Sequence, residues 1–275
     1  MRLNLSEVTI CAIDCVTPRL AADAISISTQ NIEFGDAILL SDQIIDGPFN
    51  GVQIERLNSR NDYSRFIIES LLSYISTEYV LIVQWDGFVT SKNSWQNKFL
   101  DYDYIGARWP WHNDGFSVGN GGFSLRSKRL MKEALVDLVG VDYSLNEDEL
   151  ICRVLRSSLE GRGIKFASDE IADQFSYERT SPEGETFGFH GLFNMWRHCD
   201  DSKMLDLFPY LSGGTYASIE YLELMIVYLK QKKFHLYKKM YQLLQHSLNS
   251  SDIRQHFAKY VDDAVFIDYL ISVGQ

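Results

Sequence analysis

The sequence predicts an α/β fold, a sheet flanked by helices and followed by a small C-terminal all-helical region. Over roughly the first ninety residues, apolar runs of strand length alternate with segments of helical periodicity. This order is typical of parallel strands whose faces are covered by helices. From about residue 200 onward, the apolar residues recur only at helical spacing. We therefore expect one domain over residues 1–199 and a helical region over residues 200–275.

The expected strands of the first half are short runs rich in valine, isoleucine and leucine, at residues 8–16, 36–41, 52–54 and 79–86. One helix is expected over residues 20–28, and Asn61-Asp62 can cap a second one. In open α/β sheets, ligands bind beyond the carboxyl ends of the strands. The sequence therefore places Asp14, Thr17 and Asp86 near one edge of the sheet.

The second half begins with a region rich in glycine and aromatic side chains. Residues 119–122 contain three glycines and predict a turn, and residues 123–126 read as a strand that leaves it. An apolar, helical-looking run follows at residues 150–155. Farther on, three or four helices are expected, with Gly213-Gly214 as a loop.

Composition excludes some functions. The formal net charge is -11 and the pI is about 5.0, whereas nucleic-acid binding needs a basic surface that neutralises phosphates. The start of the chain lacks the pattern of a signal peptide, and no apolar run is long enough to span a membrane. These observations favour a cytoplasmic protein with reduced cysteines. Residues 230–239 are rich in lysine. This segment could contact anionic lipid at a membrane surface, or it could be the solvated face of a helix.

Four acidic or imidazole side chains, at three places in the sequence, are candidates for chemistry. Asp86 stands at the end of a buried strand, where it could be a ligand of a divalent metal or simply begin a β-turn. His190 lies between glycines and aromatic residues and could complete a metal site, or belong to the core. Glu147-Asp148 could supply a general base, or mark a helix N-terminus with Asn146 as its cap.

Taken together, these segments resemble the GT-A class of nucleotide-sugar-dependent glycosyltransferases, and within it the catalytic region of β-1,4-galactosyltransferases. The shared order is Trp85-Asp86, the glycine-rich run 119–126, Glu147-Asp148 and Phe189-His190. A group of bacterial glycosyltransferase-like domains is more similar still. It carries variants of Gln-x-Asp-Gly-Phe, Asp-Tyr-Ile-Gly-Ala-x-Trp, Gly-Asn-Gly-Gly-Phe-Ser-Leu-Arg and Asn-Glu-Asp. The resemblance covers roughly residues 8–196 and leaves out the C-terminal helices.

The resemblance implies a GT-A-like nucleotide-binding mixed sheet flanked by helices, and a role for each matching residue. Asp86 and His190 would bind Mn2+ or Mg2+ on the donor diphosphate. Asp148 would deprotonate the acceptor hydroxyl, and Glu147 would orient sugar hydroxyls. The glycines of the turn, Gly121 and Gly122, would leave room for the donor sugar and the acceptor. The other residues expected to bind donor or acceptor are Thr17, Pro18, Arg19, Arg60, Trp85, Trp109 and Phe123, with Arg65 as an alternative to Arg60.

The implied reaction is an inverting displacement. A sugar would pass from a nucleotide-sugar donor, UDP-linked by this resemblance, to a carbohydrate or lipid-linked glycan during synthesis of a bacterial surface polysaccharide. One residue departs from the family pattern, because Gln84 stands where the first aspartate of Asp-x-Asp is expected. Two other readings stay open: a non-catalytic carbohydrate- or nucleotide-binding module, and a sugar nucleotidyltransferase. Sugar nucleotidyltransferases usually have a glycine-rich loop after the first strand, and this sequence lacks those glycines. The sequence leaves the oligomeric state open.

Overall fold

A computed structural model describes residues 2–138 and 140–275. The chain divides into two compact units, Met1–His190 and Gly191–Gln275. The first unit contains a six-stranded sheet with helices, and the described part of the second contains helices alone. The predicted α/β class, with a mixed sheet and an all-helical C-terminal region, is confirmed.

The main sheet has the strand order β3-β2-β1-β4-β6-β5. Its parallel strands are β1 (Leu3–Ile13), β2 (Ile32–Ser41), β3 (Asn50–Gln53) and β4 (Tyr79–Ile82). Two more strands complete the sheet in antiparallel orientation, β6 (Ser124–Ser127) beside β4 and β5 (Tyr104–Ile105) beside β6. The sheet is therefore mixed, and the carboxyl ends of its four parallel strands lie at one edge.

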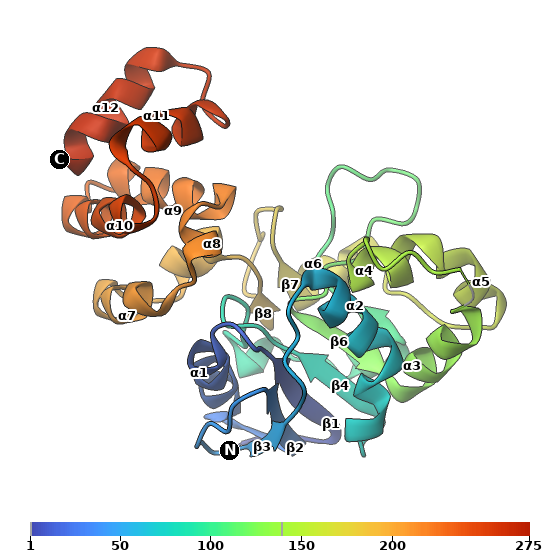
Figure 1. Cartoon of the computed structure of the whole chain (residues 1–275). Coiled ribbons are helices and arrows are strands. Elements are labelled where there is room, and N and C mark those ends of the chain that lie inside the picture. Colours follow the sequence, from blue (N-terminus) through green and yellow to red (C-terminus); the bar gives the residue numbers. More distant parts are fainter. Residues whose placement is uncertain (1, 139) are drawn as a thin grey trace. The chain divides into compact units, whose positions relative to one another are not determined.

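Alternating side chains of β1 belong to two different cores, one on each face of the sheet. Val8, Ile10 and Ala12 share a buried cluster with residues of α1 (Pro18–Thr29). Cys11 and Ile13 point the other way, into a cluster that also contains residues of the helices on the opposite face. Those helices are α2 (Arg60–Glu69), η1 (Leu71–Tyr74) and α3 (Lys128–Ala134) (Figure 1).

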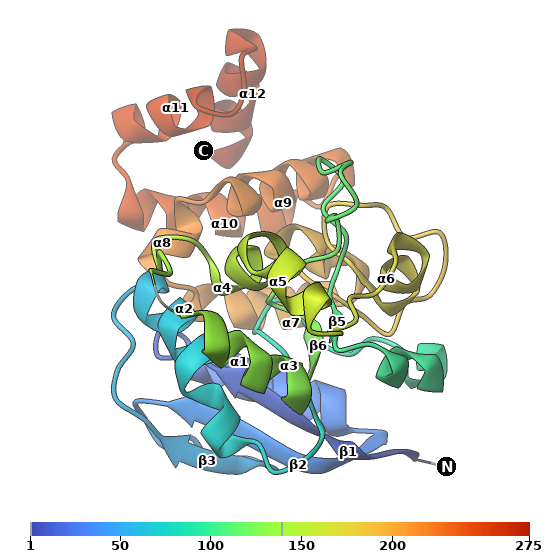
Figure 2. The same ribbon diagram turned by 90° about the vertical axis from the view of Figure 1, so that its right-hand side faces the viewer.

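Further short elements of the first unit follow β4 in the chain. Figure 2 shows the first unit from the side, with α2 and α3 above the sheet. These elements are η2 (Lys92–Ser94), η3 (Asn97–Asp101), η4 (Leu135–Asp137), α4 (Glu147–Glu149), η5 (Leu150–Val154), α5 (Arg156–Gly161), α6 (Asp169–Phe175), β7 (Ser176–Tyr177) and β8 (Gly188–Phe189).

Three local predictions need correction. The side chain that caps α2 is that of Ser59, whose hydroxyl accepts from the amide of Asp62 at 3.1 Å. The fourth strand ends at Ile82, before the predicted residue 86, because the chain turns sharply there. The run 150–155 begins with a π-helix, η5, a form that is frequent at functional sites.

The second unit consists of eight described helices. They are η6 (Leu192–Arg197), α7 (Asp201–Leu207), η7 (Phe208–Tyr210), α8 (Gly213–Tyr216), α9 (Ile219–Lys230), α10 (Phe234–Ser247), α11 (Ser250–Ala258) and α12 (Ala264–Gly274). Gly213 and Gly214, predicted as a loop, begin α8 instead, because Ser212 accepts a hydrogen bond from the amide of Thr215 and caps that helix. Within the described ranges, we find no helix with the length and apolar character that a membrane span requires.

Candidate active site

Three segments distant in sequence meet beyond the carboxyl end of β4. Because β4 and β6 are antiparallel, with Ile82 opposite Ser124, the turn after β4 and the glycine-rich loop before β6 lie at the same end of the sheet. The third segment is β8, which approaches through a bridge between Val89 and Gly188. This pairing brings His190, the residue after β8, to the same place.

The turn after β4 spans Gln84 to Gly87. The amide of each of these two residues donates to the carbonyl of the other, at 3.1 and 3.0 Å. Trp85 and Asp86 therefore occupy the two central positions, and Asp86 is 6% exposed. The carboxylate predicted to end a strand sits in a tight turn instead, held in a largely buried position.

The imidazole of His190 is surrounded by polar side chains. Its Nε2 lies 3.1 Å from Gln84 Oε1 and 3.5 Å from Asp86 Oδ1. On the other side of the ring, Nδ1 lies 3.0 Å from Glu178 Oε1 and 3.1 Å from Asn120 Nδ2. The structure thus brings Asp86 and His190 together and places three more polar side chains around the imidazole, those of Gln84, Glu178 and Asn120.

The glycine-rich loop packs between His190 and the acidic pair. A Cβ atom on Gly121 would lie 1.9 Å from Glu147 Oε1, and one on Gly122 would lie 2.1 Å from His190 Nε2. Such distances are far below van der Waals contact, so only glycine fits. The room at these two glycines, expected to serve sugar binding, is filled by the protein's own carboxylate and imidazole.

Asp148 is attached to the same loop. Its Oδ2 accepts from the amide of Gly121 at 2.8 Å, and its Oδ1 accepts from the amide of Glu149 at 2.8 Å. Burial and the negative charge of Glu147 raise the pKa of Asp148 to about 7, although the two amides and Arg126 act in the opposite direction. A carboxyl group with a pKa near neutrality is suited to general-base chemistry.

The raised pKa of Asp148 predicts a pH dependence of stability. The folded state binds the proton more tightly than the unfolded state, so this contribution is complete below pH 4 and is lost as the pH rises to about 7. A change of one in pKa corresponds to about 1.4 kcal/mol. Solvent screening at this partly exposed carboxyl reduces the total, and we expect the unfolding free energy, relative to Asp148→Asn, to fall by about 2 kcal/mol. Urea denaturation of both proteins across this pH range measures the difference; parallel curves would contradict it.

Glu147 belongs to a buried ion pair. Its Oε1 lies 2.7 Å from Arg126 NH2, and the side chains are 7% and 1% exposed. The guanidinium also donates to Ser124 Oγ at 3.0 Å, and its centre lies 5.3 Å from the ring of Tyr104. Glu147 was predicted to orient sugar hydroxyls; in the structure, its carboxylate faces Arg126 and supports the loop that carries Gly121.

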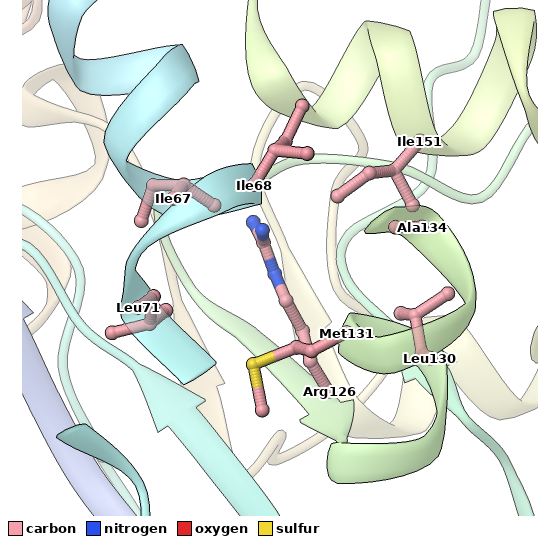
Figure 3. Close-up of a pocket in the computed structure, with 8 residues that line it drawn as sticks. All are labelled: Ile67, Ile68, Leu71, Arg126, Leu130, Met131, Ala134 and Ile151. Atoms are coloured by element: carbon pink, nitrogen blue, oxygen red, sulfur yellow. The ribbon is translucent and has the colours of Figure 1, made fainter. Parts of the chain in front are cut away.

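The Arg126 side chain also lines an apolar cavity between helices (Figure 3). Its NH1 atom is buried and has no hydrogen-bond partner within the described ranges. The other lining residues are Ile67, Ile68, Leu71, Leu130, Met131, Ala134 and Ile151. Because the walls are apolar, Glu147 supplies the only carboxylate paired with Arg126 among the described residues.

A divalent cation would find few protein ligands here. Among the described residues, no group of three or more His, Cys, Asp or Glu side chains is arranged to hold a metal ion. Asp86 Oδ1 and His190 Nε2, 3.5 Å apart, have the separation of two ligands that are each about 2.1 Å from one ion. With the amide oxygen of Gln84, they fit a partial site whose remaining ligands come from a substrate.

The other predicted polar binding residues follow β1 or lie on α2. Thr17 donates its amide and hydroxyl to Asp14, at 2.6 and 2.9 Å, after β1. The next two residues begin α1, with Pro18 buried and Arg19 exposed. Exposed Arg60 begins α2. The guanidinium of Arg65, also on α2, lies 4.9 Å from the ring centre of Tyr143.

The aromatic predictions divide into two outcomes. Trp85 is half-buried in the turn after β4. Trp109 is 8% exposed and covers Gly119, where a Cβ atom would lie 2.1 Å from its ring. Phe123 is fully buried beside Phe175 and Phe187. Phe123 is therefore a core residue and is not available to a ligand.

Sequence reasoning missed Glu178, Asn120, Tyr63 and Arg126 as parts of this site. Tyr63 lies on α2 and its hydroxyl accepts from Gln84 Nε2 at 3.2 Å. Asn120 has φ of 60°, a conformation that costs energy outside glycine and clusters at functional sites. Glu178 could have been noticed, since Glu178 and His190 each follow an aromatic residue within a short apolar segment.

Residues 48–190 match the protein family described as "Protein of unknown function (DUF5672)". The chain belongs to this family. The matched segment begins just before β3 and ends at His190, so it contains Gln84, Asp86, the glycine-rich loop, the acidic pair and Glu178. No protein with a curated function matches the sequence.

Three solved structures are similar to parts of the chain. One is a glycosyltransferase involved in the glycosylation of the major capsid of PBCV-1, at 13% identity and TM-score 0.44, over 66% of this chain and 91% of that one. The second is the apo-form glycosyltransferase GlyE of Streptococcus pneumoniae, at 12% identity and TM-score 0.40, over 69% of this chain and 54% of that one. The third is the mannosyltransferase PcManGT from Pyrobaculum calidifontis in complex with GDP-Man and Mn2+, at 10% identity and TM-score 0.43, over 97% of this chain and 85% of that one. At these identities and TM-scores, the likeness carries no argument about activity.

Proposed function

We propose that the chain is a glycosyltransferase that moves a sugar from a nucleotide-sugar donor to a carbohydrate acceptor. One observation carries the proposal: a single glycine-rich loop holds Asp148 through the amide of Gly121 and packs against His190 at Gly122. A carboxyl group with a pKa near 7 and an Asp86–His190 pair thus belong to one compact site. Transfer to a hydroxyl needs a base for the acceptor and a site for the leaving diphosphate.

In the proposed reaction, Asp148 accepts the proton of the acceptor hydroxyl as that oxygen attacks the anomeric carbon, while the bond from this carbon to the diphosphate oxygen breaks and the nucleoside diphosphate leaves. A single base on the acceptor side suits inversion of configuration. The resemblance to β-1,4-galactosyltransferases, and with it the UDP-linked donor and the role in bacterial surface polysaccharide, belongs to this proposal. Thr17 to Arg19 lie after β1, the strand next to β4, which suits contact with the nucleotide.

Asp86 and His190, with Gln84, would hold a divalent cation, either Mn2+ or Mg2+. Such a cation, when bound, supplies positive charge to the departing diphosphate. The protein offers one carboxylate, one imidazole and one amide oxygen at this position. The replacement of an aspartate by Gln84 makes the site less negative, so its affinity should depend strongly on the diphosphate that completes it.

Nucleotide binding is the first test. A ligand that binds the folded state stabilises it by about 2.7 kcal/mol at a concentration one hundred times its Kd. We expect UDP to raise the Tm, and to raise it more with Mn2+ than with EDTA. Asp86→Asn should lose the part that depends on Mn2+. If no nucleotide or nucleotide sugar shifts the Tm, with or without the metal, the proposal fails.

A non-catalytic binding module is the second candidate, and the observation that favours it is Gln84 in place of an aspartate. Such a module would bind nucleotide or glycan but release no nucleotide when both are present. Measuring UDP release from UDP-sugars with and without glycan acceptors separates the two candidates.

A further inference from the structure

The positive charges of the second unit are concentrated at one place. Residues 230–239, which end α9 and begin α10, contain five lysines and no acidic residue. Residues 191–275 contain nine Lys or Arg and nine Asp or Glu, so the net charge of -11 belongs to the first unit. The turn between α9 and α10 is therefore a basic segment in a unit that is otherwise acidic.

One lysine of this turn occupies a backbone position that ordinarily belongs to glycine. The amide of Lys232 donates to the carbonyl of Leu229 at 3.0 Å. That of Lys233 donates to the carbonyl of Tyr228 at 2.9 Å. These two bonds form a Schellman motif, whose left-handed residue is usually glycine because a Cβ atom is strained there.

The left-handed residue of this motif is Lys232, with φ of 59°. Among the described residues other than glycine, the only other positive φ is that of Asn120, in the candidate active site. Backbone strain of this kind clusters at functional sites. The conformation of Lys232 therefore indicates that its side chain has a function at this turn.

Most of the lysines at the turn are available to a partner. Lys233 is paired with Asp201 at 2.5 Å. Four others make no ion pair with a described residue, and all but the last, which is half-buried, are exposed: Lys230, Lys232, Lys238 and Lys239. Uncompensated charges of one sign repel one another, so a surface that keeps them together suits an anionic partner.

An aromatic ring lies among these charges. Phe234 begins α10 and is 43% exposed. Exposed Lys238 follows four residues later, on the same side of the helix. The buried side of α10 includes Leu236, Tyr237 and Met240. Lysines around an exposed aromatic ring are typical of helices that lie on anionic membranes, where the amines meet the headgroups and the ring enters the interface.

We propose that the turn between α9 and α10, with Lys230, Lys232, Phe234 and Lys238, binds the surface of an anionic lipid bilayer. One turn is enough to reach a bilayer. A nucleic acid fits less well, because its affinity comes from many phosphate contacts along the duplex or strand and the rest of the chain is acidic. The proposal does not depend on the proposed glycosyltransferase activity.

Co-sedimentation of the full chain with vesicles of phosphatidylcholine, with or without phosphatidylglycerol, tests the proposal. We expect binding only when phosphatidylglycerol is present, and weaker binding at high salt because ions screen the attraction. Each lysine near an anionic surface contributes about fivefold in affinity. The triple variant Lys230→Gln, Lys232→Asn, Lys238→Gln should therefore bind about 100-fold more weakly. Asn is chosen for position 232 because it tolerates the left-handed conformation.

Lys259→Gln is the matched control, because Lys259 is an exposed lysine of the same unit that follows α11, outside the basic turn. It should bind as tightly as the wild type. A wild type without preference for phosphatidylglycerol, or a triple variant that binds as tightly as Lys259→Gln, overturns the proposal.

Lys232→Gly separates lipid binding from folding. The change removes one charge and also relieves the left-handed strain. We expect the Tm to rise while the affinity for phosphatidylglycerol vesicles falls about fivefold. A lower Tm with unchanged affinity would show that Lys232 serves the fold and not the membrane.

A fluorescent oligonucleotide, titrated at the same salt concentration, tests the other class of anionic partner. We expect it to bind more weakly than the phosphatidylglycerol vesicles. If it binds more tightly, and the triple variant loses that binding, the turn is a nucleic-acid site and the assignment to lipid is wrong.

Discussion

Replacement of Asp148 by Asn is expected to reduce the rate of sugar transfer by about 10²- to 10⁴-fold, the usual contribution of a general base. Asn keeps an oxygen that can accept from the amide of Gly121, so the loop should stay in place. It cannot take a proton from the acceptor hydroxyl. Initial rates with a nucleotide sugar and a glycan acceptor measure the effect, and the Tm shift with UDP checks that donor binding is retained.

Glu149→Gln is the control for this experiment, because Glu149 is the exposed neighbour of Asp148. The pH profile adds a second criterion. Since the base must be ionised, kcat/KM of the wild type should rise tenfold per pH unit below about 7 and level off above it. If the Asp148→Asn variant transfers sugar as fast as the Glu149→Gln variant, Asp148 is not the base.

Replacement of Glu147 by Ala is expected to lower the unfolding free energy by about 3–5 kcal/mol, because it leaves a buried guanidinium without its partner. Arg126 is 1% exposed and lines an apolar cavity, and its NH1 has no hydrogen-bond partner within the described ranges. Urea denaturation measures the loss. The double variant Glu147→Ala, Arg126→Met should be less destabilised than Glu147→Ala alone, since it removes the unpaired charge as well.

Asp114→Ala provides the comparison, because Asp114 pairs with Arg153 at 2.8 Å where both side chains reach solvent. Exposed pairs contribute little, so this change should have a much smaller effect. If the two single variants are equally stable, Glu147 does not hold Arg126 in the way described.

Much of the fold followed from local sequence pattern. Helices α1 and α2 and strands β1, β2 and β6 lie where apolar periodicity and turn residues predicted them, within a few residues. Errors occurred where a side chain or a turn overrode the pattern. Ser59 caps α2, and a tight turn at Gln84 ends β4 early.

For the candidate site, too, some residues could be predicted from the sequence and others could not. Asp86, Asp148 and His190 could be selected from sequence, because each is a titratable residue beside glycines or at the end of an apolar run. The residues that these side chains contact could not be selected from the sequence. Glu178 approaches His190 through the pairing of β7 with β8, and Arg126 meets Glu147 across twenty-one residues of chain. Contacts of this kind depend on strand order and register, which leave no local signal.

By itself, the sequence determined the α/β class and the helical C-terminal region, because these follow from periodicity, and it offered Asp86, Asp148 and His190 as candidates for chemistry by residue type. Only the tertiary structure decided what fills the space at Gly121 and Gly122, namely the carboxylate of Glu147 and the imidazole of His190. It also raised the pKa of Asp148. Both results come from burial and close packing between distant segments, and these exist only once the sheet has brought those segments together.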